Sequence, residues 1–462
     1  MSLTFSDRGA SSGRREFRFV TLVCVFILVA GIGIAAGWSF VQGPRLHGIT
    51  VDVNSLSKRS DATLTLRLDR AISGVSANQI TIRPSAPFEV QHRGLDIELT
   101  FLRPLLADTQ YEIQVSDLRP SALGRAGNFS AKFETGTFQF LYLTQTSGMV
   151  QVREASLDRS PSRVLFEARG IRSAISVASI LAVVSESENG RILRLVDPDS
   201  GAEEIVNFPP GFELVNLAKA SWGTTLILTA NLHRENGDID YDALVLLDVL
   251  GDRVPEPVTG FTDEPLSVRS VHVSSTSGEI LIWLKSREVL RFNPLTNVLL
   301  PIGTASELWG FDSLGEHALY VDSLGTVAQN ISTGEIARVP AGKWEGTFVD
   351  HQKFLLAPDA TRVHRVQVPG ISDGNPYDLV TVEKEEGVHE WLAGSIDVPG
   401  SIGDIGLSAN GQYLLVEFNP LSSEIGFQGL SQAQVRNSTA IQIFDLSKGS
   451  KIDEFPGFSF RW

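Results

Sequence analysis

A four-part unit recurs through the chain after Phe138 and limits what this region can fold into. Each copy has a strand, a Ser/Gly turn, an apolar strand, a strand ending in Asp or Asn, a tight turn and a last strand. The first turn occurs at Ser277-Gly278, Leu314-Gly315 and Asn410-Gly411, and the second at 197–201, 293–297, 330–334 and 445–449. The Gly or Asn that closes each turn predicts a positive φ. We expect the Asp or Asn that opens the second turn to accept hydrogen bonds from the turn's own backbone.

The spacing of this unit predicts a closed ring. The second turn recurs 45 residues after Asp248 and again 37 residues later, and periods of about 40–50 residues with four strands each are typical of propeller blades. Six complete blades are expected to begin near Gly170, Phe212, Val268, Ser306, Lys343 and Gly400. A further blade at 138–169 lacks its inner strand. We predict that Phe458–Trp462 supplies it and closes a seven-bladed ring, because closure removes exposed strand edges.

The same residues carry a family resemblance. Over 138–462 the chain resembles β-propellers of the TolB-like and quinoprotein-like kind, and the turns listed above are the matching stretches. The tryptophan docking pattern of quinoproteins is not evident, so the resemblance implies no quinone cofactor. The resemblance implies a role in recognition or assembly. It does not by itself imply an enzymatic activity, because one fold hosts many functions.

A second all-β segment lies at 44–136. Short runs such as Leu64–Leu68, Ile97–Phe101 and Tyr111–Val115 alternate apolar and polar residues with the period of a half-buried strand. Such strands, spaced by Gly and Pro turns, predict a β-sandwich. With Leu105–Tyr111 and Phe133–Thr135, the segment resembles bacterial Ig-like domains of surface proteins, which implies a spacer or an adhesion module.

The segment at 19–41 is uncharged and apolar, and four arginines precede it. A helix of this length reaches about 34 Å, enough to cross a membrane. The arginines predict a cytoplasmic tail at 1–18, with the rest of the chain outside the cell membrane. The run is longer than a signal peptide's apolar region, which favours a permanent anchor. Cleavage near Gly37 remains the alternative.

The charge and the cysteine count exclude some classes of protein. The chain has a formal net charge of −15, so its surface repels nucleic acid. The single cysteine, Cys24, lies within the predicted span. No disulfide therefore supports the exterior fold, whose stability must come from buried apolar area.

Candidate binding residues lie in loops that a propeller places on one face. The longest departures from the repeat are at 233–242 and 419–438, between the second and third strands of the third and seventh blades. Three tryptophans that precede first strands can form an aromatic platform or pack between blades: Trp309, Trp344 and Trp391. An alternation of oxygen-bearing side chains gives either a calcium loop or a solvated acidic loop: Asn236, Asp238, Asp240 and Asp242.

No motif points to catalysis. The G-x-S-x-G match at Gly9–Gly13 lies in the predicted tail, and His389-Glu390 has no second histidine four residues on. We therefore predict no catalytic or metal-binding residues. The chain is expected to be a membrane-tethered binding or assembly protein that recognises a protein or cell-envelope glycan. The alternative is an envelope hydrolase with converging carboxylates at the propeller mouth.

Overall fold

The structure is a computed structural model of the whole chain. It describes a set of segments that covers most of the two all-β regions: residues 19, 21–30, 43–122, 124–158, 160–218, 220–221, 223–274, 276–344, 347–349, 351–368, 377–383, 389–393, 400–420 and 436–462. Residues 21–30 are helical. The remainder of the predicted membrane span, at 20 and 31–41, and the predicted tail at 1–18 lie outside the described residues. Among the described helices, none has the length and apolar character needed to span a membrane.

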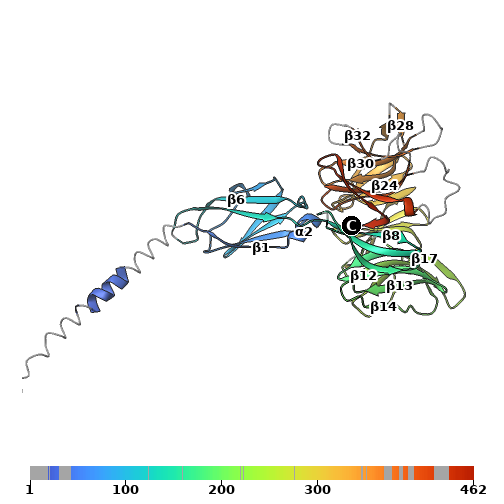
Figure 1. Cartoon of the computed structure of the whole chain (residues 1–462), viewed down its shortest axis with the longest axis horizontal. Coiled ribbons are helices and arrows are strands. Elements are labelled where there is room, and N and C mark those ends of the chain that lie inside the picture. Colours follow the sequence, from blue (N-terminus) through green and yellow to red (C-terminus); the bar gives the residue numbers. More distant parts are fainter. Residues whose placement is uncertain are drawn as a thin grey trace, which may run out of the picture. The chain divides into compact units, whose positions relative to one another are not determined.

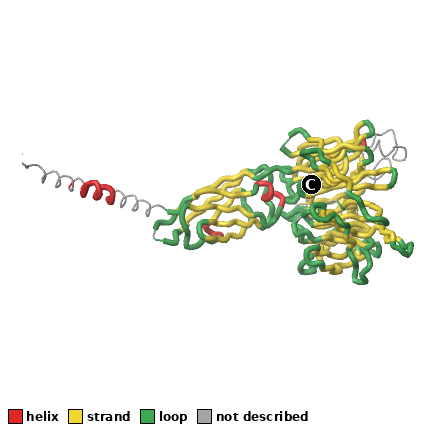
Figure 2. Tube along the Cα trace, turned by 90° about the horizontal axis from the view of Figure 1, so that it is seen from below, coloured by secondary structure: helices red, strands yellow, loops and turns green. Residues whose placement is uncertain are grey.

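The chain forms two compact units, and strands make up most of both (Figures 1 and 2). The first unit holds residues 63–102 and 110–134, together with the chain that precedes 53. The second holds 135–462 and the short segments 53–62 and 103–109. A short helix, α2 (Val53–Lys58), belongs to this second unit.

The first unit contains two antiparallel sheets. One has the order β1-β2-β5-β4, with the bounds Leu46–Val51, Thr63–Leu68, Asp96–Phe101 and Phe88–Arg93. The other has the order β3-β6-β7, with the bounds Ile80–Arg83, Gln110–Leu118 and Gly127–Glu134, and the 3-10 helix η1 (Ala77–Gln79) precedes β3. Alternate residues of β2, β5 and β6 are buried, as their period predicts. The rings of Phe101 and Phe133 meet between the sheets at 6.4 Å, so the predicted β-sandwich is present.

The described residues of the second unit form seven four-stranded antiparallel sheets, here called blades 1 to 7 in chain order (Figure 1). Blade 1 comprises β37 (Phe458–Arg461), β8 (Gln139–Thr146), β9 (Met149–Ser156) and β10 (Arg163–Ala168). Blade 2 comprises β11 (Ile171–Val177), β12 (Ile180–Ser187), β13 (Gly190–Val196) and β14 (Glu203–Ile205). Blade 3 comprises β15 (Phe212–Leu217), β16 (Thr225–His233), β17 (Ile239–Asp248) and β18 (Glu256–Pro257). Blade 4 comprises β19 (Val268–Val273), β20 (Ile280–Leu284), β21 (Glu288–Asn293) and β22 (Val298–Thr304).

The last three blades follow the same plan. Blade 5 comprises β23 (Glu307–Phe311), β24 (His317–Asp322), β25 (Gly325–Asn330) and β26 (Ile336–Arg338). Blade 6 comprises β29 (His351–Leu356), β30 (Arg362–Val368), β31 (Tyr377–Glu383) and β32 (His389–Ala393). Blade 7 comprises β33 (Gly400–Leu407), β34 (Tyr413–Pro420), β35 (Ala440–Asp445) and β36 (Ser450–Pro456).

Apolar clusters join each blade to the next around a closed ring. Separate clusters of buried residues connect blades 1 and 2, 2 and 3, 3 and 4, 4 and 5, 5 and 6, 6 and 7, and finally 7 and 1. The last of these includes Phe460 of β37 with Phe140 and Leu415. Sheets that bury both faces against neighbours in this way define a propeller.

The C-terminal strand closes the ring, as predicted. β37 pairs with β8 through Phe458 opposite Leu143 and Arg461 opposite Leu141, and the C-terminus is drawn beside β8 in Figure 1. The turn chemistry is also confirmed. The closing residues have positive φ, for example 71° at Gly201 and 53° at Asn297. The opening Asp197 accepts hydrogen bonds from the Asp199 and Ser200 amides.

The predicted start of the sixth blade was wrong. The sequence placed it near Lys343, whereas the first strand of blade 6 begins at His351. Residues 342–349 form a separate two-stranded sheet instead, in which β27 (Gly342–Trp344) pairs with β28 (Thr347–Val349). This hairpin has the strand–turn–strand pattern of half a blade, which is why the repeat was assigned to it.

Candidate functional site: a central pocket of the propeller

The inner strands of the blades share a bulge that shapes the centre of the ring. The strand register shifts within β11, β15, β19, β23, β29 and β33, each time where the strand pairs with its blade's second strand. A bulge bends a strand and re-aims the side chains next to it. Trp309 lies in the bulge of β23 and Asp404 in that of β33. The bulges therefore place an aromatic and an acidic side chain, Trp309 and Asp404, at the centre of the ring.

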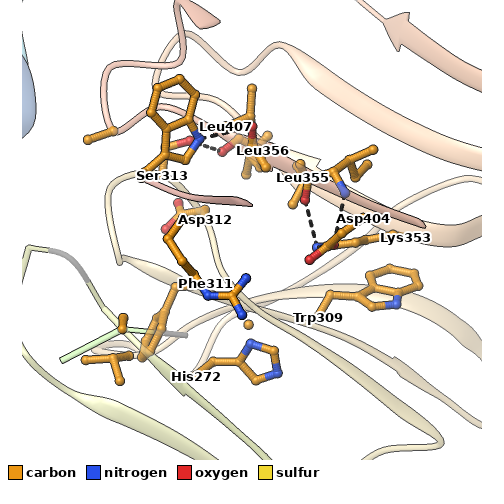
Figure 3. Close-up of a pocket in the computed structure, with 18 of the residues that line it drawn as sticks. His272, Trp309, Phe311, Asp312, Ser313, Lys353, Leu355, Leu356, Asp404 and Leu407 are labelled. Atoms are coloured by element: carbon orange, nitrogen blue, oxygen red, sulfur yellow. Dashed lines mark hydrogen bonds and ion pairs between the residues drawn. The ribbon is translucent and has the colours of Figure 1, made fainter. Parts of the chain in front are cut away.

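A pocket of about 300 Å³ lies at this centre. Its walls come from inner strands of six blades, or from the connections that follow them: β15, β19, β23, β29, β33 and β37. Figure 3 shows Trp309 and Lys353 on one side of the pocket and Phe311 and Asp312 on the other, with His272 near its lower edge. The pocket thus combines aromatic, cationic and acidic groups.

The two carboxylates that line the pocket both have basic partners. Lys353 Nζ donates to Asp404 Oδ1 at 2.6 Å and to the Ile405 carbonyl at 2.8 Å (Figure 3). Asp312 Oδ2 lies 2.8 Å from His317 Nδ1, and the Asp312 side chain is only 5% exposed. These carboxylates hold the walls of the pocket together, because breaking either pair would leave a charge without compensation.

Arg461 is an arginine of the pocket for which the described residues provide no ion-paired carboxylate. Its Nη1 donates to the Phe460 carbonyl at 2.6 Å, and among the described residues no carboxylate forms an ion pair with it. Burial lowers the pKa of Arg461, while the charges of Asp404 and Glu417 act in the opposite direction. A guanidinium keeps its charge at neutral pH. The pocket therefore presents a partly desolvated cation that an anionic ligand group would stabilise.

The predicted tryptophans lie on three different kinds of element. Trp309 is inside the inner strand β23, not before it, and it is 9% exposed. It packs in the cluster between blades 5 and 6, with its ring 6.4 Å from that of Phe354, and it also lines the central pocket. Trp344 lies in β27 and Trp391 in the outer strand β32. The side chains of these two lie outside the described part, so the aromatic platform stays a prediction.

The predicted acidic loop forms the hairpin between β16 and β17, and most of its charges are paired. Arg234 Nε and Nη2 each donate to Asp240 at 2.7 Å, and Lys285 Nζ lies 2.7 Å from Asp242 Oδ2. Asn236 Nδ2 donates to Asp238 Oδ2 at 2.7 Å. Within the described chain, no group of three or more His, Cys, Asp or Glu side chains is placed to hold a metal ion. The other predicted loop, at 419–438, lies outside the described residues except at its two ends.

The sequence reasoning missed Lys353, Asp404 and Arg461. Their positions depend on bulges and on the pairing of β37, neither of which leaves a local pattern in the sequence. The one available signal was the strand at 458–462 itself. Once it is placed innermost, its alternating side chains must point either into the ring's centre or between blades.

Fold and pocket together define the second unit as a β-propeller whose central pocket is lined by apolar side chains and a few charged ones. No protein-family model matches the chain, and no curated protein matches it. Among solved structures, it is similar to TolB from Acinetobacter baumannii, at 13% identity with a TM-score of 0.36 over 85% of this chain and 86% of that one. It is also similar to the dihydro-heme d1 dehydrogenase NirN, at 13% identity with a TM-score of 0.41 over 70% and 74% of the two chains. A prolyl endopeptidase matches at 12% identity with a TM-score of 0.47, over 70% of this chain and 50% of that one.

Proposed function

We propose that this chain is a membrane-tethered, extracytoplasmic binding or assembly protein whose β-propeller recognises a protein or a glycan. The anchor at 19–41 and the extracytoplasmic position of the rest are taken from the sequence. In this proposal the sandwich is an Ig-like spacer. The propeller is the recognition module, since rigid rings often carry binding groups on their loops and at their centres.

The observation that carries the proposal is the unpaired Arg461 in the central pocket. A desolvated cation is costly unless something compensates it, and the two carboxylate side chains of the described lining already contact Lys353 and His317. A ligand carboxylate or phosphate could form charge-assisted hydrogen bonds with the guanidinium. An acidic group of the partner is therefore the expected occupant of this pocket.

The hydrolase alternative finds less support in the same pocket. A carboxylate mechanism needs two groups flanking the scissile bond, one of them protonated as the acid. Among the described lining residues, only Asp312 and Asp404 have carboxylate side chains, and both are held in pairs with basic groups. Each carboxylate is therefore already engaged in a contact within the wall of the pocket.

Affinity capture with pocket variants tests the proposal. The purified full-length chain is immobilised and exposed to cell-envelope extract, in parallel with Arg461→Gln and Arg461→Lys. We expect a partner that the wild type retains and that Arg461→Gln loses roughly tenfold or more, since a charge-assisted hydrogen bond contributes about 1.5–3 kcal/mol. Arg461→Lys should restore part of the binding, because it keeps the charge.

Arg338→Gln is the matched control, since Arg338 lies on the outer strand β26 and bonds Asp322, away from the pocket. It should retain the partner fully. An identical set of captured molecules for the wild type and Arg461→Gln would contradict the proposal. Release of soluble glycan or peptide fragments by the wild type, abolished in Asp404→Asn, would favour the hydrolase instead.

A further inference from the structure

A second cavity, of about 380 Å³, lies at the seam between blades 1 and 7. It is lined by residues of β8 and β9, by the end of β36 and by residues 436 and 437. The turn between β8 and β9 and the connection between β34 and β35 both join second to third strands, so the cavity opens on the face where the sequence predicted recognition. It shares no lining residue with the central pocket. We call it the arginine pocket, after Arg153 and Arg436.

Arg153 is held in place by neutral groups only. Its Nε donates to Ser162 Oγ at 3.2 Å, its Nη2 to the Ser162 carbonyl at 3.1 Å, and its Nη1 to Gln151 Oε1 at 2.9 Å. These bonds fix the plane of the guanidinium without neutralising it. Among the described residues, no carboxylate forms an ion pair with Arg153. The side chain is thus pre-organised with its charge available to a ligand.

Arg436 is the second cation of the arginine pocket. Its guanidinium carbon lies 5.0 Å from the centre of the Phe458 ring, a distance typical of a cation–π contact. The described chain gives it no ion-paired carboxylate. Burial lowers the pKa of Arg436, and the neighbouring charge of Arg172 acts in the same direction, against Glu186 and Glu417. Glu186 is itself paired with Arg172, and Glu417 accepts the Ser459 amide at 2.9 Å.

The remaining wall of the pocket is largely polar, and none of its described lining residues is acidic. Most of its other side chains end in hydroxyl or amide groups: Thr144, Gln145, Thr146, Gln151, Ser162 and Asn437. Groups of this kind exchange hydrogen bonds with sugar hydroxyls, since each can donate and accept. Tyr142 and Phe455 add aromatic surface, and their rings lie 5.8 Å apart. In a chain with 54 acidic and 39 basic residues, a cavity whose described lining has two arginines and no carboxylate is a selective environment for an anion.

The charges around the pocket favour one negative charge over two. Glu186 and Glu417 attract Arg436 from outside the lining, and Glu167 accepts from Gln151 Nε2 at 2.5 Å. These acids reduce the positive potential that a dianion would need, whereas a planar monoanion matches the fork of a guanidinium.

We propose that the arginine pocket binds an acidic sugar, specifically a sugar unit that carries a carboxylate, such as a uronic acid within a glycan. Arg153 and Arg436 bind the carboxylate, and the hydroxyl and amide side chains bind the ring hydroxyls. The site does not depend on the central pocket, so either one can fail its test without the other.

Calorimetric titration of the purified full-length chain tests this assignment with four probes: glucuronate, glucose, acetate and glucose 6-phosphate. We expect glucuronate to bind at least about tenfold more tightly than glucose or acetate, because only it offers both the charge and the hydroxyls. Arg153→Gln and Arg436→Gln should each weaken glucuronate binding by about tenfold or more. Arg338→Gln, whose arginine lies on the outer strand of blade 5, should leave it unchanged.

Four results would overturn the proposal. The first is no glucuronate binding at about 10 mM, which corresponds to less than about 3 kcal/mol of binding free energy. The second is equal binding of glucuronate and acetate, and the third is full glucuronate binding by Arg436→Gln. Tighter binding of glucose 6-phosphate would overturn the choice of a carboxylate in favour of a phosphate. Thermal unfolding of each variant separates a lost site from a lost fold. Arg436→Gln is the decisive variant, because Arg153 also forms hydrogen bonds that join Ser162 and Gln151 within blade 1.

Discussion

Gly411, which ends the first turn of blade 7, has almost no free space beside its Cα. Its φ is +71°, and a Cβ placed there would lie 2.5 Å from Pro358 Cδ and 2.8 Å from Ala357 Cβ of the preceding blade. Gly411→Ala should therefore destabilise the protein by about 2–4 kcal/mol, through backbone strain together with steric overlap. The free energy of unfolding in urea measures this loss.

Gly201→Ala is the matched control for this substitution. Gly201 has the same φ of +71°, but a Cβ there would meet nothing within 4 Å. The control should cost only the backbone term, about 1 kcal/mol. Equal losses in the two variants would contradict the view that Gly411 is needed for close packing between blades.

Residues that act through their own local backbone were the most predictable from the sequence. The turn glycines adopt positive φ, and Asp197 accepts a hydrogen bond from a backbone amide of its own turn, as these residue types do in many proteins. Arg461, Asp404 and the two arginines of the arginine pocket were not predictable in the same way. Their roles come from neighbours distant in sequence, such as the Ser162 oxygens at Arg153 and the Phe458 ring at Arg436.

At the scale of single elements, one ion pair links the second and fourth strands of blade 5. Arg338 of β26 donates from Nη1 and Nη2 to the two oxygens of Asp322, at 2.6 and 2.7 Å. The hydrogen bond from Arg338 holds the pKa of the Asp322 carboxyl below its ordinary value. A depressed pKa in the folded state contributes stability above the ordinary pKa of about 3.9, and this is lost as pH falls through the folded-state value.

We therefore expect Asp322→Asn to destabilise the protein at pH 7 and to matter progressively less below about pH 4. Urea unfolding of the wild type and the variant across this range measures the difference. Arg338→Gln should remove the same pH-dependent part of the free energy of unfolding, because Arg338 and Asp322 form one ion pair. If the difference in free energy of unfolding between the wild type and Asp322→Asn stayed constant with pH, the stabilising role of the Asp322–Arg338 ion pair would be contradicted.

The bulges of the inner strands show why elements are predicted more easily than their registers. The alternating pattern located most strands, but the one-residue shift at Trp309 in β23 leaves no sequence pattern of its own. The hairpin β27–β28 was misassigned for a related reason. Two short strands and a turn look alike whether or not two more strands pair with them, because pairing is decided by packing between distant segments.

At the scale of the whole molecule, the repeat predicted the ring because each blade buries its faces only against other blades. A four-stranded sheet with two apolar faces is not stable alone, so its neighbours on both sides are required. This argument also predicted which strand completes blade 1. It could not predict a ligand, since ring closure places the same constraint on every propeller whatever its pockets hold.

Deleting residues 458–462 should therefore destabilise the entire ring. Phe458 and Phe460 are each 6% exposed, and they contribute to clusters with blade 2 and blade 7 as well as with their own blade. Losing two buried phenylalanines costs more than about 5 kcal/mol, which approaches the total stability of an ordinary domain. The deletion should lower the unfolding temperature sharply or prevent folding, as judged by circular dichroism and limited proteolysis. Removing only Trp462, which is 37% exposed, should cost much less, and equal stability of the full chain and the five-residue deletion would contradict closure by β37.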